Sequence, residues 1–334
     1  MNVLVGDIGG TKTILAIFSS EMGPHSPIEE KTYHSARYES LEVMVQEYLD
    51  EVKIEVDHAC FGVAGPVVAG RARITNLTWV VDAAALQKAC NLAEVALLND
   101  LESVGYAIPI LRQEDIHTIN AGESVPGGSI AVLAPGTGLG EGFLTYDNGV
   151  YRAHASEGSH VSFAPVGDLQ VGLLTYLNKQ GHNHVSFERV CSGGPGMPNL
   201  YAYLKSTGLE EPAWLAERLS SSEDPTPVIF SAAHDTSRPC ELAQATLDLF
   251  ITILGAEAGN LALKVLSTGG IYLGGGISPR ILNDLHKPIF LEALRSKGRF
   301  RQLLANMPLH VILNSKAGLL GAAAFGLTIP APCP

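Results

Sequence analysis

The sequence predicts an α/β protein built from two domains, and three observations support this. The chain has 334 residues, more than one hydrophobic core usually organises. Short apolar runs typical of buried strands alternate with longer segments of helical periodicity. A strand that ends in a glycine turn and continues into a second strand occurs twice, near residue 9 and near residue 138. We therefore expect two related domains with a cleft between them.

The first hairpin begins almost at the N-terminus. Residues 3–8 and 13–18 are mostly apolar, and Gly9 and Gly10 are expected to supply the positive φ of a tight turn. A P-loop or a dinucleotide fingerprint would lead from a strand into a helix, whereas this chain continues as a strand. Backbone N–H groups in such a turn can face phosphate oxygens, and Asp7 can hold a hydrated divalent cation. The alternative is an ordinary hairpin without a ligand.

Three elements are expected next. The apolar spacing within 40–52 predicts an amphipathic helix. Two nearly uncharged runs, 58–64 and 94–98, have the composition of strands buried on both faces. The second run stops at Asn99 and Asp100, and a helix follows. Asp100 should therefore lie at the carboxyl end of a buried strand, where open α/β sheets place their chemistry.

The second half of the chain starts in the same way as the first. A strand over 129–134 meets a glycine-rich turn over 135–142, and a second strand follows, which suggests structural duplication. A long helix is expected over 242–266, and then a strand, a glycine turn and a helix capped by Ser278.

Two further segments complete the pattern. The stretch from Ser220 to Pro227 has the composition of a surface loop. The last helix, 316–326, is rich in small residues and is expected to pack back on the first domain.

Charge and composition exclude several classes of function. The chain is 46% hydrophobic and 17% charged, which is typical of a soluble α/β enzyme. Its net charge of −12 disfavours nucleic acid and anionic membranes as partners. Without a signal peptide or a membrane-length run of about 18 apolar residues, a cytoplasmic location is expected. The five scattered cysteines indicate neither disulfides nor a zinc site. The His182/His184 pair is expected to be solvated, and the sequon at Asn76 is not expected to be glycosylated.

Four features in chain order resemble the sugar-kinase/actin/heat-shock-ATPase superfamily. They are the hairpin at 6–13, Asn99-Asp100, the glycine turn at 135–142 and Leu273-Gly274-Gly275-Gly276. Three more segments resemble the hexokinase-type bacterial glucokinases, namely Leu98-Asn99-Asp100, Glu157-Gly158-Ser159-His160 and Glu188-Arg189-Val190-Cys191-Ser192-Gly193-Gly194-Pro195-Gly196. The resemblance spans nearly the whole chain. It implies the two-domain actin-like/ribonuclease-H-like ATPase fold with an interdomain cleft.

The resemblance also assigns a sugar site. It implies that Asn99, Asp100, Glu157, His160 and Glu188 contact the sugar hydroxyls, with Gly138 approaching through its backbone. Ionised carboxylates form the stronger, charge-assisted hydrogen bonds to hydroxyl donors, which suits a pyranose. Glu157 and His160 would share a face if their segment is helical. Solvated surface is the alternative for both and for Glu188.

Asp100 is the expected general base. Phosphoryl transfer needs alignment, charge neutralisation and one carboxylate to receive the hydroxyl proton. The alternative is that Asp100 only caps the helix that follows it.

For the nucleotide, the resemblance implies ATP with Mg²⁺, the metal held by Asp7 through water. The expected ATP-binding residues are Gly6, Asp7, Ile8, Gly9, Gly10, Thr11, Lys12, Thr137, Gly274 and Gly275. The zinc motif of related repressor-type sugar kinases does not follow His160, so no structural zinc is expected.

These inferences predict an ATP-dependent glucokinase that phosphorylates the 6-hydroxyl of glucose. We expect a small domain of residues 1–110 plus 314–330, a large domain of 111–313, and a homodimer. Two alternatives remain. One is a non-catalytic sugar-sensing regulator on the same fold, which the absence of room for a DNA-binding arm before residue 3 disfavours. The other is a polyphosphate-dependent hexokinase, which would want a basic track. The segment 210–241 carries no assigned role.

Overall fold

The computed structural model describes residues 1–74 and 77–330, so Asn76 and Cys333 lie outside the described residues. The chain divides into two compact units. Unit 1 comprises residues 1–115, 143–155 and 314–334, and unit 2 comprises 116–142 and 156–313. Unit 1 takes in 143–155, which the expected division had placed in the large domain. The reason is packing, since the Gly105 position of α3 lies against the side chains of Leu144 and Ala153.

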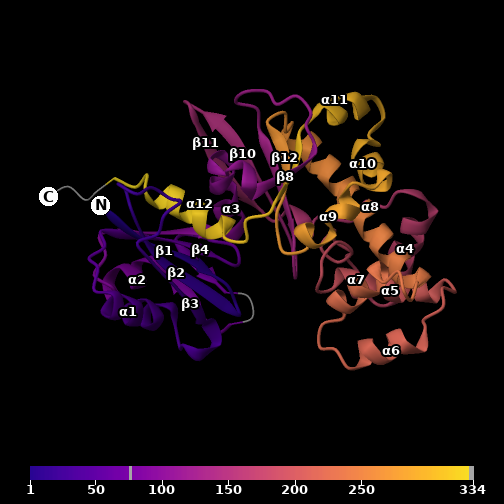
Figure 1. The fold of residues 1–334 in the computed structure, drawn as a ribbon, viewed down its shortest axis with the longest axis horizontal. Coiled ribbons are helices and arrows are strands. Elements are labelled where there is room, and N and C mark those ends of the chain that lie inside the picture. Colours follow the sequence, from indigo (N-terminus) through magenta and orange to yellow (C-terminus); the bar gives the residue numbers. More distant parts are fainter. Residues whose placement is uncertain (75–76, 331–334) are drawn as a thin grey trace. The chain divides into compact units, whose positions relative to one another are not determined.

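Unit 1 is built on a five-stranded sheet of order β3-β2-β1-β4-β7 (Figure 1). β1 pairs antiparallel with β2 and parallel with β4, and β7 pairs parallel with β4. The carboxyl ends of β1, β4 and β7 therefore meet at one edge. The strands are β1 (Asn2–Ile8), β2 (Lys12–Ser19), β3 (Glu29–His34), β4 (His58–Val63) and β7 (Val95–Asn99), with β5 (Arg71–Arg73) and β6 (Val80–Asp82) forming a separate pair.

Side-chain alternation gives this sheet two buried faces. One face of β1, β2 and β4 packs with α1 (Leu41–Val52) and α2 (Ala83–Ala89), and the other packs with α12 (Ala317–Gly326). Figure 1 shows α1 and α2 on one side of the sheet and α3 (Asp100–Ala107) and α12 on the other. The predicted helices at 40–52, 101–108 and 316–326 and the predicted strands at 58–64 and 94–98 are confirmed within one or two residues.

The crossing of α3 and α12 depends on a small residue. A Cβ on Gly321 would overlap the Ser103 carbonyl oxygen and lie 2.7 Å from the Ala107 nitrogen. The small-residue composition of α12 therefore allows two helix backbones to approach closely, and α12 packs in the first unit as expected.

The second sheet has the order β11-β10-β9-β12-β13-β8. Its first five strands repeat the arrangement of the first sheet. In each sheet three consecutive strands lie side by side, and two later strands add next to the first of the three. β12 lies parallel to both β9 and β13. The predicted structural duplication is thus confirmed. The strands are β8 (Ile116–Asn120), β9 (Ile130–Pro135), β10 (Leu139–Asp147), β11 (Val150–Ser156), β12 (Gly270–Leu273) and β13 (Leu309–Ile312).

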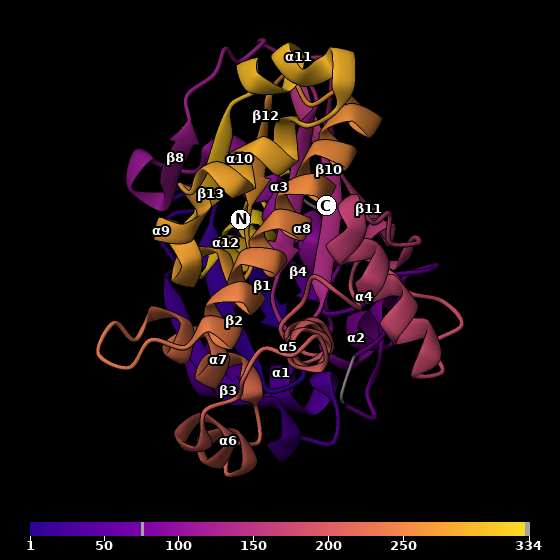
Figure 2. The same cartoon turned by 90° about the vertical axis from the view of Figure 1, so that its right-hand side faces the viewer.

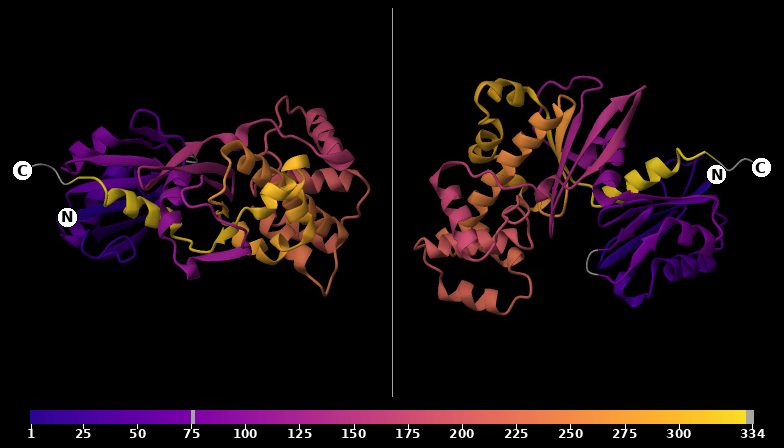
Figure 3. Two further views of the ribbon diagram at one scale, coloured as in Figure 1. Left: turned by 90° about the horizontal axis from the view of Figure 1, so that it is seen from above. Right: turned by 180° about the vertical axis from the view of Figure 1, so that it is seen from behind.

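The helices of unit 2 gather around α8 (Glu241–Val265), which packs against β9 (Figures 2 and 3). α8 is long and apolar enough to cross a membrane by length and composition alone, but 78% of its apolar window is buried inside the protein, as in the central helix of a folded domain. The remaining helices are α4 (Gly167–Lys179), α5 (Gly196–Ser206), α6 (Ala213–Ser220), α7 (Pro225–His234), α9 (Leu282–Leu285), α10 (Pro288–Arg295) and α11 (Arg301–Asn306), with short 3₁₀ turns between some of them.

The expected surface loop at 220–227 is wrong at its second half, because α7 begins at Pro225. Asp224 caps the helix by accepting a hydrogen bond from the Thr226 backbone N–H, and Pro225 suits the first helical position. Thr226 is buried, and its hydroxyl donates to the Gly193 carbonyl oxygen. The segment therefore supports the glycine run that follows Glu188.

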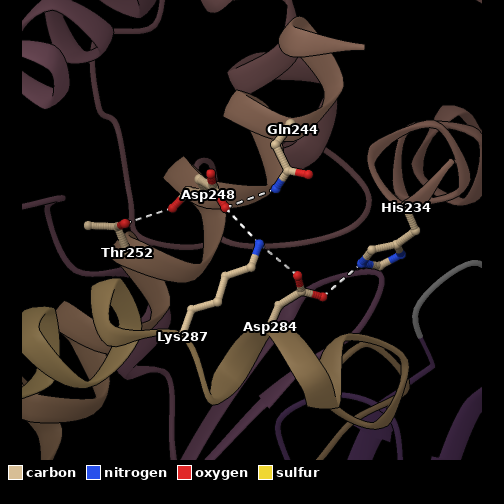
Figure 4. A network of polar contacts seen from close by, with 6 residues as sticks. All are labelled: His234, Gln244, Asp248, Thr252, Asp284 and Lys287. Carbon is tan, nitrogen blue, oxygen red and sulfur yellow. Dashed lines mark hydrogen bonds and ion pairs between the residues drawn. The ribbon is translucent and has the colours of Figure 1, made fainter. Parts of the chain in front are cut away.

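A polar network ties four helices of unit 2 together (Figure 4). The buried carboxylate of Asp284 accepts a hydrogen bond from His234 Nε2 at 2.8 Å and pairs with Lys287 Nζ at 2.9 Å. Lys287 Nζ also lies 3.1 Å from Asp248 Oδ1, which accepts from Gln244. Helices α7, α8, α9 and α10 are thereby joined through side chains.

Replacing Asp284 with Ala should lower the free energy of unfolding by about 1–3 kcal/mol, because it removes two charge-assisted bonds from a carboxylate that is 6% exposed. Chemical denaturation measures this loss. Glu292→Ala is the matched control, since its pair with Arg301 is about half exposed and should contribute less than about 1 kcal/mol. Equal losses in the two variants would contradict a structural role for the buried network.

Candidate active site

In unit 1 the expected functional side chains meet at the carboxyl edge of the sheet. The strand register sets Asp7 beside Gly62 of β4, and Val63 beside both Ile8 of β1 and Asn99 of β7. The Asn99 amide donates to the Gly65 carbonyl oxygen at 3.0 Å. This hydrogen bond joins the ends of β4 and β7.

Asn99, and not Asp100, is the N-cap of α3. Its Oδ1 accepts from the Leu101 backbone N–H, and Glu102 Oε2 accepts from the Asn99 backbone N–H at 3.3 Å, which completes a capping box. Asp100 is the first helical residue, and its Oδ1 also accepts from Leu101 N–H at 2.9 Å. Since Asn99 supplies the cap, a capping role is not sufficient to explain a carboxylate at position 100.

The turn after β1 is compact for a different reason from the one predicted. Neither Gly9 nor Gly10 has a positive φ, so that part of the prediction is wrong. Gly9 is required because its N–H donates to the Lys12 carbonyl oxygen at 3.1 Å and a Cβ would lie 2.9 Å from that oxygen. Ser35 lies in the 3₁₀ turn that follows β3 and stabilises the turn after β1, because its hydroxyl donates to the Gly9 carbonyl and its N–H donates to the Thr11 carbonyl. The side chains of Thr11 and Lys12 are exposed.

Gly6 and Ile8 lie within the packed strand β1. A Cβ on Gly6 would crowd Phe61, 2.6 Å away, and Ile8 is buried. Both residues shape the strand that carries the turn, and only their backbones are available to a ligand.

Asp7 is the second-to-last residue of β1 and lies near the turn that follows this strand. Burial raises the pKa of Asp7, and the positive charge of Lys12 opposes this. The missing side chain of Gly318 leaves room beside it, since a Cβ there would lie 3.4 Å from Asp7 Oδ2. A divalent cation at this place would favour the charged carboxylate. Among residues 1–74 and 77–330, no group of three His, Cys, Asp or Glu side chains could hold a metal.

In unit 2 the three expected sugar-binding side chains come together. His160 Nε2 lies 3.7 Å from Glu157 Oε2, and His160 Nδ1 lies 3.5 Å from Glu188 Oε2. Glu157 precedes a 3₁₀ turn at Gly158–His160, so the expected helical face is a single tight turn instead. The Glu157 and His160 side chains are more than half exposed, as residues that meet a ligand must be.

The backbone around this cluster is held by pairing between two segments. Glu188 N–H donates to the Ser159 carbonyl, and Phe187 N–H donates to the Val161 carbonyl. His184 was expected to be only solvated, but its Nε2 donates to the His160 carbonyl oxygen at 2.9 Å. Local sequence does not indicate this contact, because it joins residues 24 positions apart.

Gly138 belongs to the same cluster. A Cβ on Gly138 would lie 3.3 Å from Glu188 Oε1. The glycine turn therefore brings backbone next to the Glu188 carboxylate, and the expected approach of Gly138 to the sugar stays a prediction.

Close backbone contacts account for glycines in the expected nucleotide turns and in the segment that follows Glu188. Gly193 and Gly194 donate to the carbonyl oxygens of Gly136 and Thr137 at 2.7 and 2.8 Å. Gly274 N–H donates to the Leu133 carbonyl, and Gly275 has φ +73° and no room for a side chain, since a Cβ there would overlap the Pro135 carbonyl oxygen. The Gly274–Leu133 hydrogen bond thus joins the ends of β9 and β12.

Open space lies on the outer side of these turns. A Cβ built on Gly136 or Gly276 meets nothing within 4 Å, and Thr137 is exposed. Accessible backbone of this kind can approach phosphate or ribose closely, so the residues present fit a nucleotide.

Ser278 does not cap the helix after this turn. It is the second residue past Gly276 and lies inside a 3₁₀ turn, Ser278–Ile281, with no side-chain cap. Its buried hydroxyl is one of several in the described residues without a hydrogen-bond partner. The predicted cap is therefore wrong, because the chain tightens into a 3₁₀ turn before α9 begins.

A sequence model of the glucokinase family matches residues 4–328. The chain belongs to the glucokinase family. A glucokinase of Nostoc punctiforme is 40% identical over 336 residues, which cover 96% of this chain and 97% of that relative. The crystal structure of a glucokinase from an Antarctic psychrotroph is 34% identical and matches with a TM-score of 0.82, covering 97% of this chain and 98% of that one.

A more distant glucokinase shares the fold alone. The structure from Balamuthia mandrillaris, solved in complex with glucose, is 21% identical and has a TM-score of 0.79 over 98% of this chain and 93% of that one. The membership in the glucokinase family and the predicted two-domain α/β sugar-kinase fold are confirmed.

Proposed function

We propose that this chain transfers the γ-phosphoryl group of ATP to the 6-hydroxyl of glucose, with Asp100 as the general base. Asp100 lies at the carboxyl end of β7, one residue after the N-cap of α3. A carboxylate in this place can receive the hydroxyl proton as the oxygen attacks phosphorus in line.

Glucose is recognised by Asn99 and Asp100 of unit 1 and by Glu157, His160, Glu188 and the Gly138 backbone of unit 2. One observation supports this set most strongly: His160 stands within 3.7 Å of both Glu157 and Glu188, so that three side chains from two segments present acceptors and a donor together. Such a group suits the several hydroxyls of a pyranose.

ATP is held by the turn after β1, with the backbone of residues 6–10 and the side chains of Thr11 and Lys12, and by Thr137, Gly274 and Gly275. Asp7 holds Mg²⁺ through water, and the ion neutralises charge on the phosphates when bound. The turns contribute backbone N–H groups, which stabilise phosphate without a basic surface. That agrees with a net charge of −12.

Replacing Glu157 or Glu188 with Gln should weaken glucose binding by about 1–3 kcal/mol, or roughly 5- to 150-fold in Kd, since a charged acceptor becomes a neutral amide. Isothermal titration calorimetry measures this directly. Thermal stability without sugar should hardly change. Wild-type affinity for glucose in both variants would show that Glu157 and Glu188 are solvated surface residues and do not bind the sugar.

The site favours an ATP-dependent enzyme over the two alternatives. A silent sensor would not need Asp100, and a polyphosphate enzyme would want a basic track. We also propose a cytoplasmic homodimer, which rests on the family resemblance. Light scattering after gel filtration distinguishes dimer from monomer, and a monomer under assay conditions would overturn that part.

A further inference from the structure

Glu141 is a buried carboxyl group that the proposed reaction does not use. It lies on β10, two residues after Leu139, and is 1% exposed. Neither of its carboxyl oxygens has a hydrogen-bond partner among the described residues. Such a group in a core needs an explanation.

The carboxyl group lies directly against the sugar-binding turn. A Cβ on Gly158 would overlap Glu141 Oε2 and lie 3.4 Å from Glu141 Cδ. Gly158 stands between Glu157 and His160, and its N–H donates to Ser156 Oγ at 2.9 Å. Glu141 therefore forms the surface on which this turn rests.

The charged groups facing Glu141 come mainly from α8. Burial raises the pKa of Glu141 to about 8, the negative charge of Glu257 adds to the rise, and Lys264 opposes it. Glu257 accepts hydrogen bonds from Asn260 at 2.8 Å and from Lys264 at 3.4 Å. Lys264 is thus engaged by Glu257, and the raised pKa of Glu141 favours its protonated form.

Four other groups complete the surroundings of Glu141. Lys297 also interacts with Glu257. Burial raises the pKa of the Cys191 thiol well above its usual value, and the negative charges of Glu257 and Glu141 add to the rise, so the thiol stays protonated. His160 and Glu157 lie on the turn itself.

We propose that Glu141 is a positioning residue for sugar binding, whose carboxyl group packs against Gly158 and holds Glu157 and His160 in the geometry that binds glucose. The proposal rests on the sugar site proposed above. It assigns Glu141 no contact with substrate.

A steric double-mutant cycle tests the contact. Gly158→Ala places a methyl group where the Glu141 carboxyl lies, and its φ is not one that excludes Ala. We expect the KM for glucose to rise about tenfold or more, with the KM for ATP changed less than about twofold. Adding Glu141→Ala makes room for the methyl, so the double variant should recover at least part of the loss. Independent, additive effects would overturn the proposal.

The pH dependence gives a second, isosteric test. In the wild type the KM for glucose should rise as pH increases from 7 to 9. Glu141 then ionises beside Glu257, and the packing of its carboxyl group against Gly158 should change. Glu141→Gln keeps the shape and cannot ionise, so this rise should be reduced in the variant. Identical profiles would contradict the proposal.

Glu157→Gln, measured in parallel, separates this proposal from the sugar site itself. If Glu157→Gln raises the KM for glucose and the Glu141 and Gly158 variants do not, only the positioning role fails. If Glu157→Gln has no effect, the sugar site fails and the positioning role fails with it. Thermal melts of each variant confirm that folded protein is being compared.

Discussion

Replacing Asp100 with Asn is expected to lower kcat by about 10²–10⁴ while glucose binding is largely kept. This is the usual contribution of a positioned acid or base. Asn has nearly the same shape, and its Oδ1 can still accept the hydrogen bond from Leu101 N–H that Asp100 accepts. The fold at the start of α3 should therefore survive, since Asn99 supplies the cap.

Steady-state kinetics with glucose and ATP, together with calorimetric glucose titration, measure the two effects separately. Glu102→Gln is the matched control, because it removes another carboxylate from the first turn of α3 and keeps an oxygen for the capping box. Its kcat should stay within about threefold of the wild type. Near-normal turnover in Asp100→Asn would reject Asp100 as the base, and turnover lost only through lost affinity would make it a sugar ligand instead.

Gly321→Ala should destabilise the fold of unit 1 strongly. Helix propensity alone would favour Ala by about 1 kcal/mol. The methyl group would, however, overlap the Ser103 carbonyl oxygen of α3, which is backbone and has no rotamer to yield. Overpacking of this kind typically costs about 1–3 kcal/mol and more where backbone must shift. We expect a net loss of about 2 kcal/mol or more in the free energy of unfolding.

Gly318→Ala lies one turn earlier on the same helix and serves as the control. Its methyl group would meet Asp7 at an ordinary contact distance of 3.4 Å, so stability should be unchanged or slightly raised. Urea denaturation of both variants gives the comparison. Equal or higher stability of Gly321→Ala would show that α3 and α12 do not cross in close backbone contact.

Local patterns predicted the parts of the fold that local forces decide. Continuous, nearly uncharged apolar runs located β1, β4 and β7, and the i, i+3, i+4 spacing of Leu41, Met44 and Val45 located α1. Asn99-Asp100 was predictable as a site because it ends a buried run.

Long-range contacts decided what local patterns missed. Gly9 is needed for a carbonyl contact and not for a positive φ, and Gly193 and Gly194 for their approach to the 136–137 backbone. Thr226 and His184 reach the site from segments that looked like loops. In the sequence, Glu141 is only one residue of the glycine-rich turn expected at 135–142. Its contact with Gly158 is visible only in the structure, and this contact is what suggests a positioning role for its carboxyl group.

The central claim is tested most directly by measuring the formation of glucose 6-phosphate. A coupled dehydrogenase assay compares phosphoryl donors, and an ADP-release assay compares hexoses. With ATP, Mg²⁺ and glucose, the purified chain should form glucose 6-phosphate with one ADP released per product. Other hexoses should react more slowly, and polyphosphate should not replace ATP. No glucose 6-phosphate with ATP, or faster formation with polyphosphate, would contradict the account.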